Sequence, residues 1–318
     1  MAPPSAERSA RRPVDPVALA RVQARMNRAE AAPWLHTEVA RRMAERLPVV
    51  RLQPQHIIDW GAHLGASRAL LEQAYPRATV TAVEPDEGRR AATALALQAP
   101  WWSPRRWRAS AGVGVGSGAG SGAGSVCVEG AVSPAAAQLV WANMGLHGAI
   151  DPQAVMAQWH RALQIDGFLM FSTLGPGTFD GLRALYQRAG WGAPHAPFVD
   201  MHDLGDMLVA AGFADPVMDQ ETLTLNWASA AALLAELRQL GGNVDPDRFA
   251  GLRTPRWKQQ LCTRLGATAG PGGRVSLSVE VVYGHAFRAA PSWRLGAETQ
   301  VPLAELRSAI RAGRRQGG

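Results

Sequence analysis

The 318-residue chain has only one lysine, Lys258, and only two cysteines, Cys127 and Cys262. Two cysteines cannot build a disulfide framework, and their spacing matches no zinc motif, so no metal site is predicted. The low cysteine content fits a reducing compartment, and we predict a cytoplasmic location. No apolar run reaches the roughly 18 residues that a membrane-spanning helix needs, and no apolar signal core follows the N-terminus. We therefore expect no membrane partner.

Excess positive charge is confined to the two ends of the chain. The formal net charge is +7, of which residues 1–14 contribute +2 and residues 288–318 contribute +4, leaving +1 for the body from 15 to 287. A basic isoelectric point that comes from two tails is weak support for nucleic-acid binding, so no nucleic-acid partner is predicted. We expect residues 1–14 to be a disordered lead and residues 288–318 to be a flexible basic tail.

The segment 111–125, AGVGVGSGAGSGAGS, has low complexity. Its glycines fall only at even-numbered positions, 112 through 124, whereas a G-x-G-x-x-G motif needs one glycine at an odd offset. A dinucleotide-binding loop therefore cannot lie in this segment. We predict that it is a flexible insertion at the surface.

Short apolar runs alternate with helical patterns along the body of the chain. The runs suited to strands are HIIDW, ATVTAVE, VCV, QLVWAN, GFLMFSTLG, DPVMDQETLTLN and SLSVEVVYGHAF. The alternation predicts an α/β fold with a mostly parallel sheet and right-handed crossovers. In the last run apolar and polar residues alternate cleanly, which predicts an antiparallel strand near the sheet edge. Helical segments from about 229 to 266 separate the last two strands, and we expect them to form a lid over one end of the sheet.

The first strand runs into a turn that is a candidate cofactor site. In DWGAHLG, Asp59 ends the strand and Gly61 and Gly65 frame the turn, while Glu84 ends the next strand 19 residues after Gly65. Ligands of open α/β sheets bind at the carboxyl ends of the strands. The glycines let the backbone approach a ligand, and a carboxylate at the end of the second strand can bind both hydroxyls of a ribose.

The turn lacks what a nicotinamide cofactor would need. A pyrophosphate requires G-x-G-x-x-G at a helix N-terminus, and His63 stands here at the second glycine position. The pattern D-x-G-x-x-x-G suits a cofactor with ribose and adenine but no phosphate, so S-adenosylmethionine is predicted. We expect the His63 side chain only to fill space in the turn. Seven strands ending in an antiparallel one are the pattern of the Rossmann-like class I methyltransferases, which is the predicted fold class.

Three stretches resemble the BioC-type malonyl-acyl-carrier-protein O-methyltransferases of biotin synthesis, as a divergent member of that family: VWANMGLHGAIDP, LMFSTLGPGTFDGLR and FVDMHDLGDMLVAAGFADPVMDQETLTL. The resemblance runs from about residue 35 to 287 and is strongest over 138–225. It implies methyl transfer to the free carboxylate of a malonyl thioester on an acyl carrier protein. The chain departs from the family in its turn, where DWGAHLG replaces D-x-G-C-G-x-G, and in an N-terminal stretch without tyrosine.

Methyl transfer from a sulfonium to a carboxylate depends on orientation and desolvation more than on a general base. The acceptor therefore needs a cation to hold it, and the resemblance points to Arg183. His147, beyond the fourth strand, is predicted to face the acceptor. Structural alternatives stay open for both, namely a solvated helix arginine and a packed or capping histidine. The candidates for binding the cofactor are Asp59, Gly61, Ala62, Gly65, Glu84, Glu129 and Asn143.

An acidic carrier protein would need a basic docking surface. Within the predicted lid, basic side chains gather in DRFAGLRTPRWKQQLCTR, and we name them the lid patch: Arg248, Arg253, Arg256, Lys258 and Arg264. A solvated helix face is the alternative for these residues. Two further functions also stay open, a methyltransferase acting on another small acceptor and a non-catalytic binding protein with a degraded cofactor loop. His63 and the short N-terminal stretch favour the latter, whereas the retained Asp59 and Glu84 favour a methyltransferase.

Overall fold

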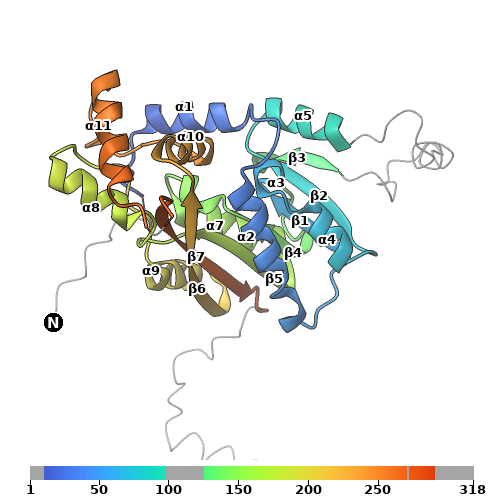
Figure 1. Cartoon of the computed structure of the whole chain (residues 1–318). Helices are drawn as coiled ribbons and strands as arrows, with labels where there is room; N and C mark the ends of the chain where they lie inside the picture. Colours follow the sequence, from blue (N-terminus) through green and yellow to red (C-terminus); the bar gives the residue numbers. More distant parts are fainter. Residues whose placement is uncertain (1–10, 98–124, 271, 291–318) are drawn as a thin grey trace, which may run out of the picture. The chain divides into compact units, whose positions relative to one another are not determined.

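The computed structural model describes residues 11–97, 125–270 and 272–290 (Figure 1). The strands in these residues are β1 (His56–Trp60), β2 (Thr79–Glu84), β3 (Val126–Val128), β4 (Ala137–Ala142), β5 (Leu163–Leu174), β6 (Ala214–Trp227) and β7 (Val275–Phe287). The α-helices are α1 (Pro16–Met26), α2 (Trp34–Ala44), α3 (Ala62–Gly65), α4 (Arg68–Ala74), α5 (Glu87–Leu97), α7 (Pro152–Ala162), α8 (Asp180–Ala189), α9 (Met201–Ala210), α10 (Ala230–Leu240) and α11 (Pro255–Gly266). Three short 3-10 turns complete the set: η1 (Leu47–Val49), η2 (Glu129–Ala131) and η3 (Leu146–Gly148).

The described strands form one sheet in the order β3-β2-β1-β4-β5-β7-β6. Strands β1 to β5 pair in parallel, and β7 pairs antiparallel with both β5 and β6. Chain order reverses between β1 and its neighbour β4, and such a reversal creates a crevice at the carboxyl ends of the strands. This arrangement confirms the predicted class I methyltransferase fold, including the antiparallel last strand.

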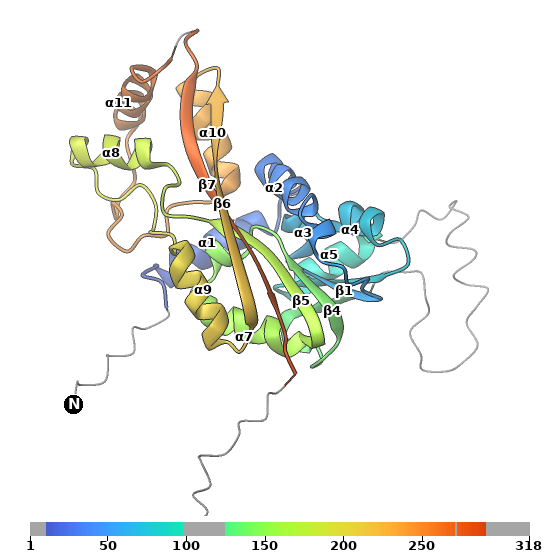
Figure 2. The ribbon, with the colours of Figure 1, turned by 90° about the horizontal axis from the view of Figure 1, so that it is seen from below.

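Helices cover both faces of the sheet (Figure 2). Because neighbouring residues of a strand point to opposite faces, Ile57 and Ile58 of β1 enter different apolar clusters. The cluster around Ile57 includes the buried faces of α2 and α4, and the cluster around Ile58 includes those of α7 and α9. Asp151 accepts a hydrogen bond from the backbone N–H of Ala154 at 2.9 Å and so caps the N-terminus of α7.

The long strands β6 and β7 carry a second group of helices. Helices α8, α10 and α11 lie along the part of this strand pair that is remote from α7 (Figure 2). Leu182 of α8, Leu233 of α10 and Leu261 of α11 are buried in the same cluster as Leu277 and Val279 of β7. The helical content predicted for 229–266 is thus present as α10 and α11, whereas their action as a lid stays a prediction.

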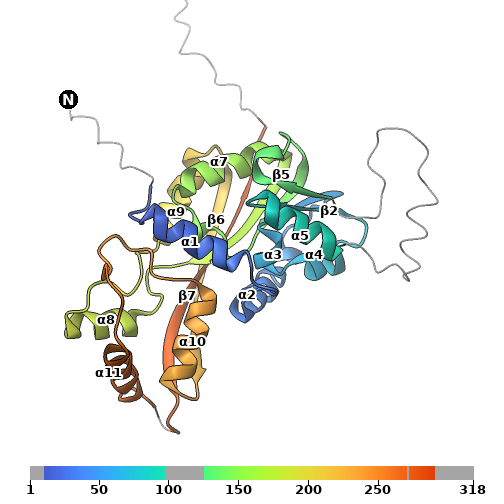
Figure 3. The ribbon, with the colours of Figure 1, turned by 90° about the horizontal axis from the view of Figure 1, so that it is seen from above.

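Helix α1 lies beside α10 and extends toward α5 (Figures 1 and 3). The Asp15 side chain caps it by accepting hydrogen bonds from the backbone N–H groups of Val17 and Ala18. Near its other end, the guanidinium of Arg25 donates to Arg238 O, in α10, at 3.2 Å.

The predicted disordered lead needs a correction at its end. Most of residues 1–14 lie outside the described residues, but Arg12 is only 8% exposed. Its backbone N–H donates to Ile150 O at 2.8 Å, which anchors the chain before α1 begins. The sequence predicted Arg12 to lie in a disordered lead because its partners are far away in the chain. The Gly-rich insertion up to residue 124 and the basic tail from residue 291 onward lie outside the described residues. Within the described residues, no helix has the length and apolar character to cross a membrane.

Candidate active site

The turn after β1 takes the shape that its glycines allow. Gly61 has a φ of +71°, a left-handed conformation that strains any residue with a Cβ. Apart from its chain neighbours, no described residue has an atom within 4 Å of the position that a Cβ of Gly61 would occupy, so the space beside the turn is open. Ala62 begins the short helix α3, and the Gly65 N–H closes it by donating to Gly61 O at 2.8 Å. These residues leave a stretch of backbone accessible for a ligand at the carboxyl end of β1.

Asp59 carries a buried carboxylate to which no described residue donates. The residue is 1% exposed, and neither carboxylate oxygen has a hydrogen-bond partner among the described residues. The pKa of Asp59 is raised from 3.8 to about 7, chiefly by burial and then by the nearby Glu84 carboxylate, while Arg68 opposes the rise. Buried polar atoms are almost always hydrogen-bonded, so an unpaired carboxylate at the end of β1 indicates a missing cation or donor.

Glu84 ends β2 beside this turn and is 1% exposed. Its Oε1 accepts hydrogen bonds from the backbone N–H of His63 at 3.0 Å and from the Thr93 hydroxyl at 2.8 Å. Burial raises the pKa of Glu84, and these two hydrogen bonds partly offset the rise. The predicted turn and the predicted ribose carboxylate are thus brought together by a direct contact.

His63 does more than fill space, so that expectation is wrong. Its Nε2 lies 2.9 Å from Ala29 O and donates to it, which ties the connection between α1 and α2 to the turn. Burial, and then the charge of Arg89, lower the pKa of His63, so the ring is neutral at neutral pH. Arg89 reinforces the same tie because its guanidinium donates to Asn27 O at 2.7 Å. The α1–α2 connection therefore lies across the carboxyl ends of β1 and β2.

Glu129 lies in η2, directly after β3. Its Oε1 accepts a hydrogen bond from the indole N–H of Trp60 at 3.1 Å, and burial raises its pKa. Since Trp60 ends β1, this contact places the Glu129 side chain next to the turn. The third strand thus contributes a carboxylate to the same edge of the sheet as Asp59 and Glu84.

Asn143 follows β4, and its side-chain amide bonds to groups inside the protein. Its Nδ2 donates to His36 O at 2.8 Å and to Gly65 O at 2.7 Å, and its Oδ1 accepts from the Ser172 hydroxyl at 2.7 Å. The side chain therefore joins α2, the turn and β5. This leaves Asn143 as a scaffold for the turn, with both amide hydrogens already donated.

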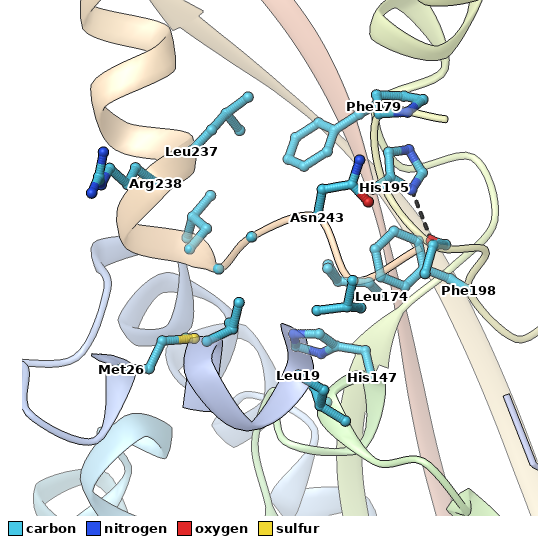
Figure 4. Close-up of a pocket in the computed structure, with 18 of the residues that line it drawn as sticks. Leu19, Met26, His147, Leu174, Phe179, His195, Phe198, Leu237, Arg238 and Asn243 are labelled. Carbon is cyan, nitrogen blue, oxygen red and sulfur yellow. Dashed lines mark hydrogen bonds between the residues drawn. The ribbon is translucent and has the colours of Figure 1, made fainter. Parts of the chain in front are cut away.

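A cavity of about 560 Å³ lies on the other side of this scaffold, with the labelled His147, His195, Phe198 and Phe179 around it in Figure 4. His36 is shared between the two regions, because its ring lines the cavity and its Nδ1 donates to Leu64 O, in the turn, at 2.8 Å. The cavity walls come from α1, η3, α10, the connection after α8 and the connection after α10. Apolar side chains such as Leu19, Leu174 and Leu237 supply much of its surface.

His147 lies in the wall of this cavity, and its position facing the acceptor stays a prediction. Burial, together with the neighbouring His36 and Arg12, lowers the pKa of His147 to about 3. Its Nδ1 is buried and has no hydrogen-bond partner among the described residues. Burial also lowers the pKa of His36, to about 4. Both rings are therefore neutral at neutral pH.

Arg183 is not among the cavity residues, although Phe179 and Leu182 from the same region are. Its guanidinium donates to Pro176 O at 2.8 Å and lies 3.3 Å from the Asp180 carboxylate. Three residues that line the cavity were not predicted from the sequence: Arg12, His36 and His195. For His195 the sequence held a signal, since it lies inside the region of strongest family resemblance, whereas Arg12 lies outside it.

Comparisons with known proteins identify the family of this chain. A search of protein-family models finds no match. The chain is 36% identical over 279 residues to the malonyl-[acyl-carrier protein] O-methyltransferase of Laribacter hongkongensis, covering 85% of this chain and 89% of that protein. The proteins of the same name from Gallionella capsiferriformans and Halorhodospira halophila are 34% and 36% identical, over 82% and 80% of this chain and 87% and 81% of their own lengths. With a class I methyltransferase sheet and relatives of this identity over most of its length, the chain belongs to the malonyl-[acyl-carrier protein] O-methyltransferase family.

Proposed function

We propose that the protein methylates the free carboxylate of a malonyl group held as a thioester on an acyl carrier protein, in biotin synthesis. As a member of the family it is a methyltransferase that uses S-adenosylmethionine. The observation that carries the proposal is a turn with the unpaired, buried Asp59 carboxylate, joined through His36 to an apolar cavity, because the His36 ring lines the cavity and bonds to Leu64 O in the turn. The turn suits a cationic cofactor, and the cavity suits a small acyl group.

The residues of the turn fit S-adenosylmethionine. The partnerless Asp59 carboxylate matches a positively charged methionine end, which would satisfy oxygens that now have no donor. Glu84 would accept from the ribose hydroxyls, and Glu129 would lie toward the adenine. Gly61, Ala62 and Gly65 would let the backbone approach, and Asn143 would hold the turn in shape. Because Glu84 is 1% exposed, we expect the α1–α2 connection to shift when the cofactor enters.

The residues around the cavity favour direct methyl transfer. When bound, S-adenosylmethionine supplies a sulfonium methyl group, and the O–CH₃ bond forms as the C–S bond breaks and its electron pair returns to sulfur. No proton has to move, and the neutral His36 and His147 rings would not protonate the acceptor carboxylate. Apolar walls exclude water from that carboxylate, which raises its reactivity. The two histidines therefore shape the cavity and have no acid–base role.

For the docking of the carrier protein we propose the exposed members of the lid patch, Arg256, Lys258 and Arg264. The other two members have partners within the protein. Arg253 donates to Trp191 O at 2.6 Å and stacks on Trp257 at 4.6 Å, and Arg248 pairs with Asp15 at 2.6 Å. Exposed cations steer an acidic partner and are screened by salt beyond about 8 Å at physiological ionic strength.

The acceptor is tested by measuring S-adenosylhomocysteine formation with malonyl-carrier protein, malonyl-coenzyme A and acetyl-carrier protein. We expect turnover with both malonyl thioesters, faster with the carrier protein, and none with the acetyl form. Absence of turnover with both malonyl thioesters would refute the proposed acceptor. A cytoplasmic location stays a prediction from the cysteine content.

The docking surface is tested with Arg256 and Lys258 changed together to Glu. We expect a large rise in KM for malonyl-carrier protein and little change for malonyl-coenzyme A. The matched control changes Arg51 and Arg77, both exposed and next to the amino ends of β1 and β2, to Glu. Equal losses in the test and control variants would show a net-charge effect and contradict a docking surface.

A further inference from the structure

Arg12 is a buried cation for which the described residues supply no anion. Its side chain is 8% exposed, and no acidic side chain pairs with it in the part of the chain that the structure describes. The guanidinium donates only to main-chain oxygens: from Nη1 to His147 O and Ala149 O, and from Nη2 to Pro197 O at 2.9 Å. Its Nε is buried and has no partner. Burial alone accounts for the lowered pKa of Arg12.

A buried cation without a counterion destabilises the folded protein. Removing an ion from water costs several kcal/mol, and neutral carbonyl groups offset that cost less well than a counterion does. Main-chain oxygens fix the position of the guanidinium but leave its charge uncompensated. The cation is therefore held in place for an anion that comes from outside the described residues.

The residues around this cation show where the anion would bind. Arg12 Nε and His147 Nδ1 are buried without partners among the described residues, and both residues line the same cavity. The guanidinium carbon of Arg12 also lies 5.8 Å from the centroid of the Phe198 ring, another wall of the cavity. A buried cation and an unpaired imidazole nitrogen beside one apolar cavity favour a small ligand that carries a charged polar end.

We propose that Arg12 binds the free carboxylate of the malonyl acceptor, the role that the sequence had suggested for Arg183. This inference rests on the proposed function and names the residue that holds the acceptor. Arg12 is well placed for it, because its contact to His147 O puts it against η3, directly beyond β4 and the Asn143 scaffold. Arg183 is bound instead to Pro176 O and to Asp180.

This role has a consequence for product release. The substrate carboxylate is an anion, whereas the methyl ester formed from it is neutral. Methyl transfer therefore removes the ion pair with Arg12, and the product binds more weakly than the substrate. The same ion pair selects a malonyl thioester over a thioester whose acyl group ends in a neutral methyl ketone.

The test compares two acyl groups of nearly the same shape. Acetoacetyl-coenzyme A matches malonyl-coenzyme A except that a methyl group replaces one carboxylate oxygen. The dissociation constants of both are measured by calorimetry on the complex with S-adenosylhomocysteine, for the wild type, Arg12→Gln and Arg12→Lys. Charge-assisted hydrogen bonds typically change affinity by roughly 10- to 100-fold. We expect Arg12→Gln to weaken malonyl binding by about that factor, to leave acetoacetyl binding within about twofold, and Arg12→Lys to restore part of the preference.

Arg11→Gln is the matched control, because Arg11 precedes Arg12 in the chain, is exposed and is not among the cavity residues. It should keep the malonyl preference of the wild type. Equal weakening of both ligands in Arg12→Gln would show a structural role and overturn the inference, as would an unchanged preference. If Arg12→Gln does not fold, Arg12→Lys decides instead: a malonyl preference that is reduced but not abolished supports the inference, and an unchanged preference overturns it. Because binding is measured without turnover, a wild type that binds malonyl through Arg12 but transfers no methyl would refute only the proposed function.

Discussion

Asp59→Asn should make the cofactor-free protein more stable while weakening cofactor binding. The carboxylate is 1% exposed and has no hydrogen-bond partner, so its ionised form is unfavourable in the folded state. Raising its pKa from 3.8 to about 7 corresponds to about 4 kcal/mol of destabilisation when the group is ionised. Local relaxation reduces this figure, and we expect roughly 2–4 kcal/mol at high pH.

The pH dependence of this effect has a definite sign. Between pH 3.8 and about 7 the folded state holds a proton on Asp59 that the unfolded state has lost, so rising pH destabilises the wild type in this window. Asparagine does not titrate. The stability advantage of Asp59→Asn is therefore near zero around pH 4 and reaches its full size above pH 7.

Urea unfolding of both proteins at several pH values between 4 and 8 measures this difference, because the remaining titrating groups are common to both. Glu30→Gln, at an exposed position, is the control and should differ little from the wild type at any pH. An Asp59→Asn protein that is less stable than the wild type at pH 8, or a stability difference that does not change with pH, would refute the view that Asp59 is an uncompensated charge.

Three further predictions concern the same edge of the sheet. Glu84→Ala should weaken S-adenosylmethionine binding roughly tenfold or more in calorimetry, since charge-assisted hydrogen bonds to ribose contribute about 1.5–3 kcal/mol; unchanged affinity would rule out the ribose contact. His63→Gly should lower the free energy of unfolding by about 1–2 kcal/mol, through the lost hydrogen bond to Ala29 O and added chain entropy, and should speed hydrogen exchange in residues 27–33; exchange as slow as in the wild type would show that the tie does not hold this segment. Cofactor affinity should rise with pH through about 7 as Asp59 ionises, and the rise should vanish in Asp59→Asn.

The sequence predicted the sheet well because its signals are local. HIIDW, GFLMFSTLG and the alternating SLSVEVVYGHAF are periodic or continuous apolar runs, and β1, β5 and β7 lie there. The turn with Gly61, and Glu84 on the next strand, could be found because strand ends fix them in space. Strand β5 nevertheless begins earlier than predicted, at Leu163, immediately after α7 ends.

Contacts between remote segments could not be predicted in the same way. Arg12 meets His147 across 135 positions of the chain, and nothing in its immediate sequence distinguishes it from the other arginines of the lead. Likewise, the His63 ring reaches Ala29 only because α1 and α2 fold across the carboxyl ends of the strands. Arg183 was suggested by family resemblance, yet its side-chain direction depends on Asp180 and Pro176 in the folded chain.

The central claim is that this chain transfers a methyl group from S-adenosylmethionine to the malonyl carboxylate. The most direct test incubates the purified full-length protein with malonyl-carrier protein and S-adenosylmethionine that carries an isotope-labelled methyl group, and follows the label by mass spectrometry of the released acyl chain. The account predicts one labelled methyl group on the malonyl moiety, removable by mild alkaline hydrolysis as expected for an ester. Unlabelled malonyl-carrier protein after incubation with enzyme that binds the cofactor, or label attached anywhere other than the carboxylate, would contradict it.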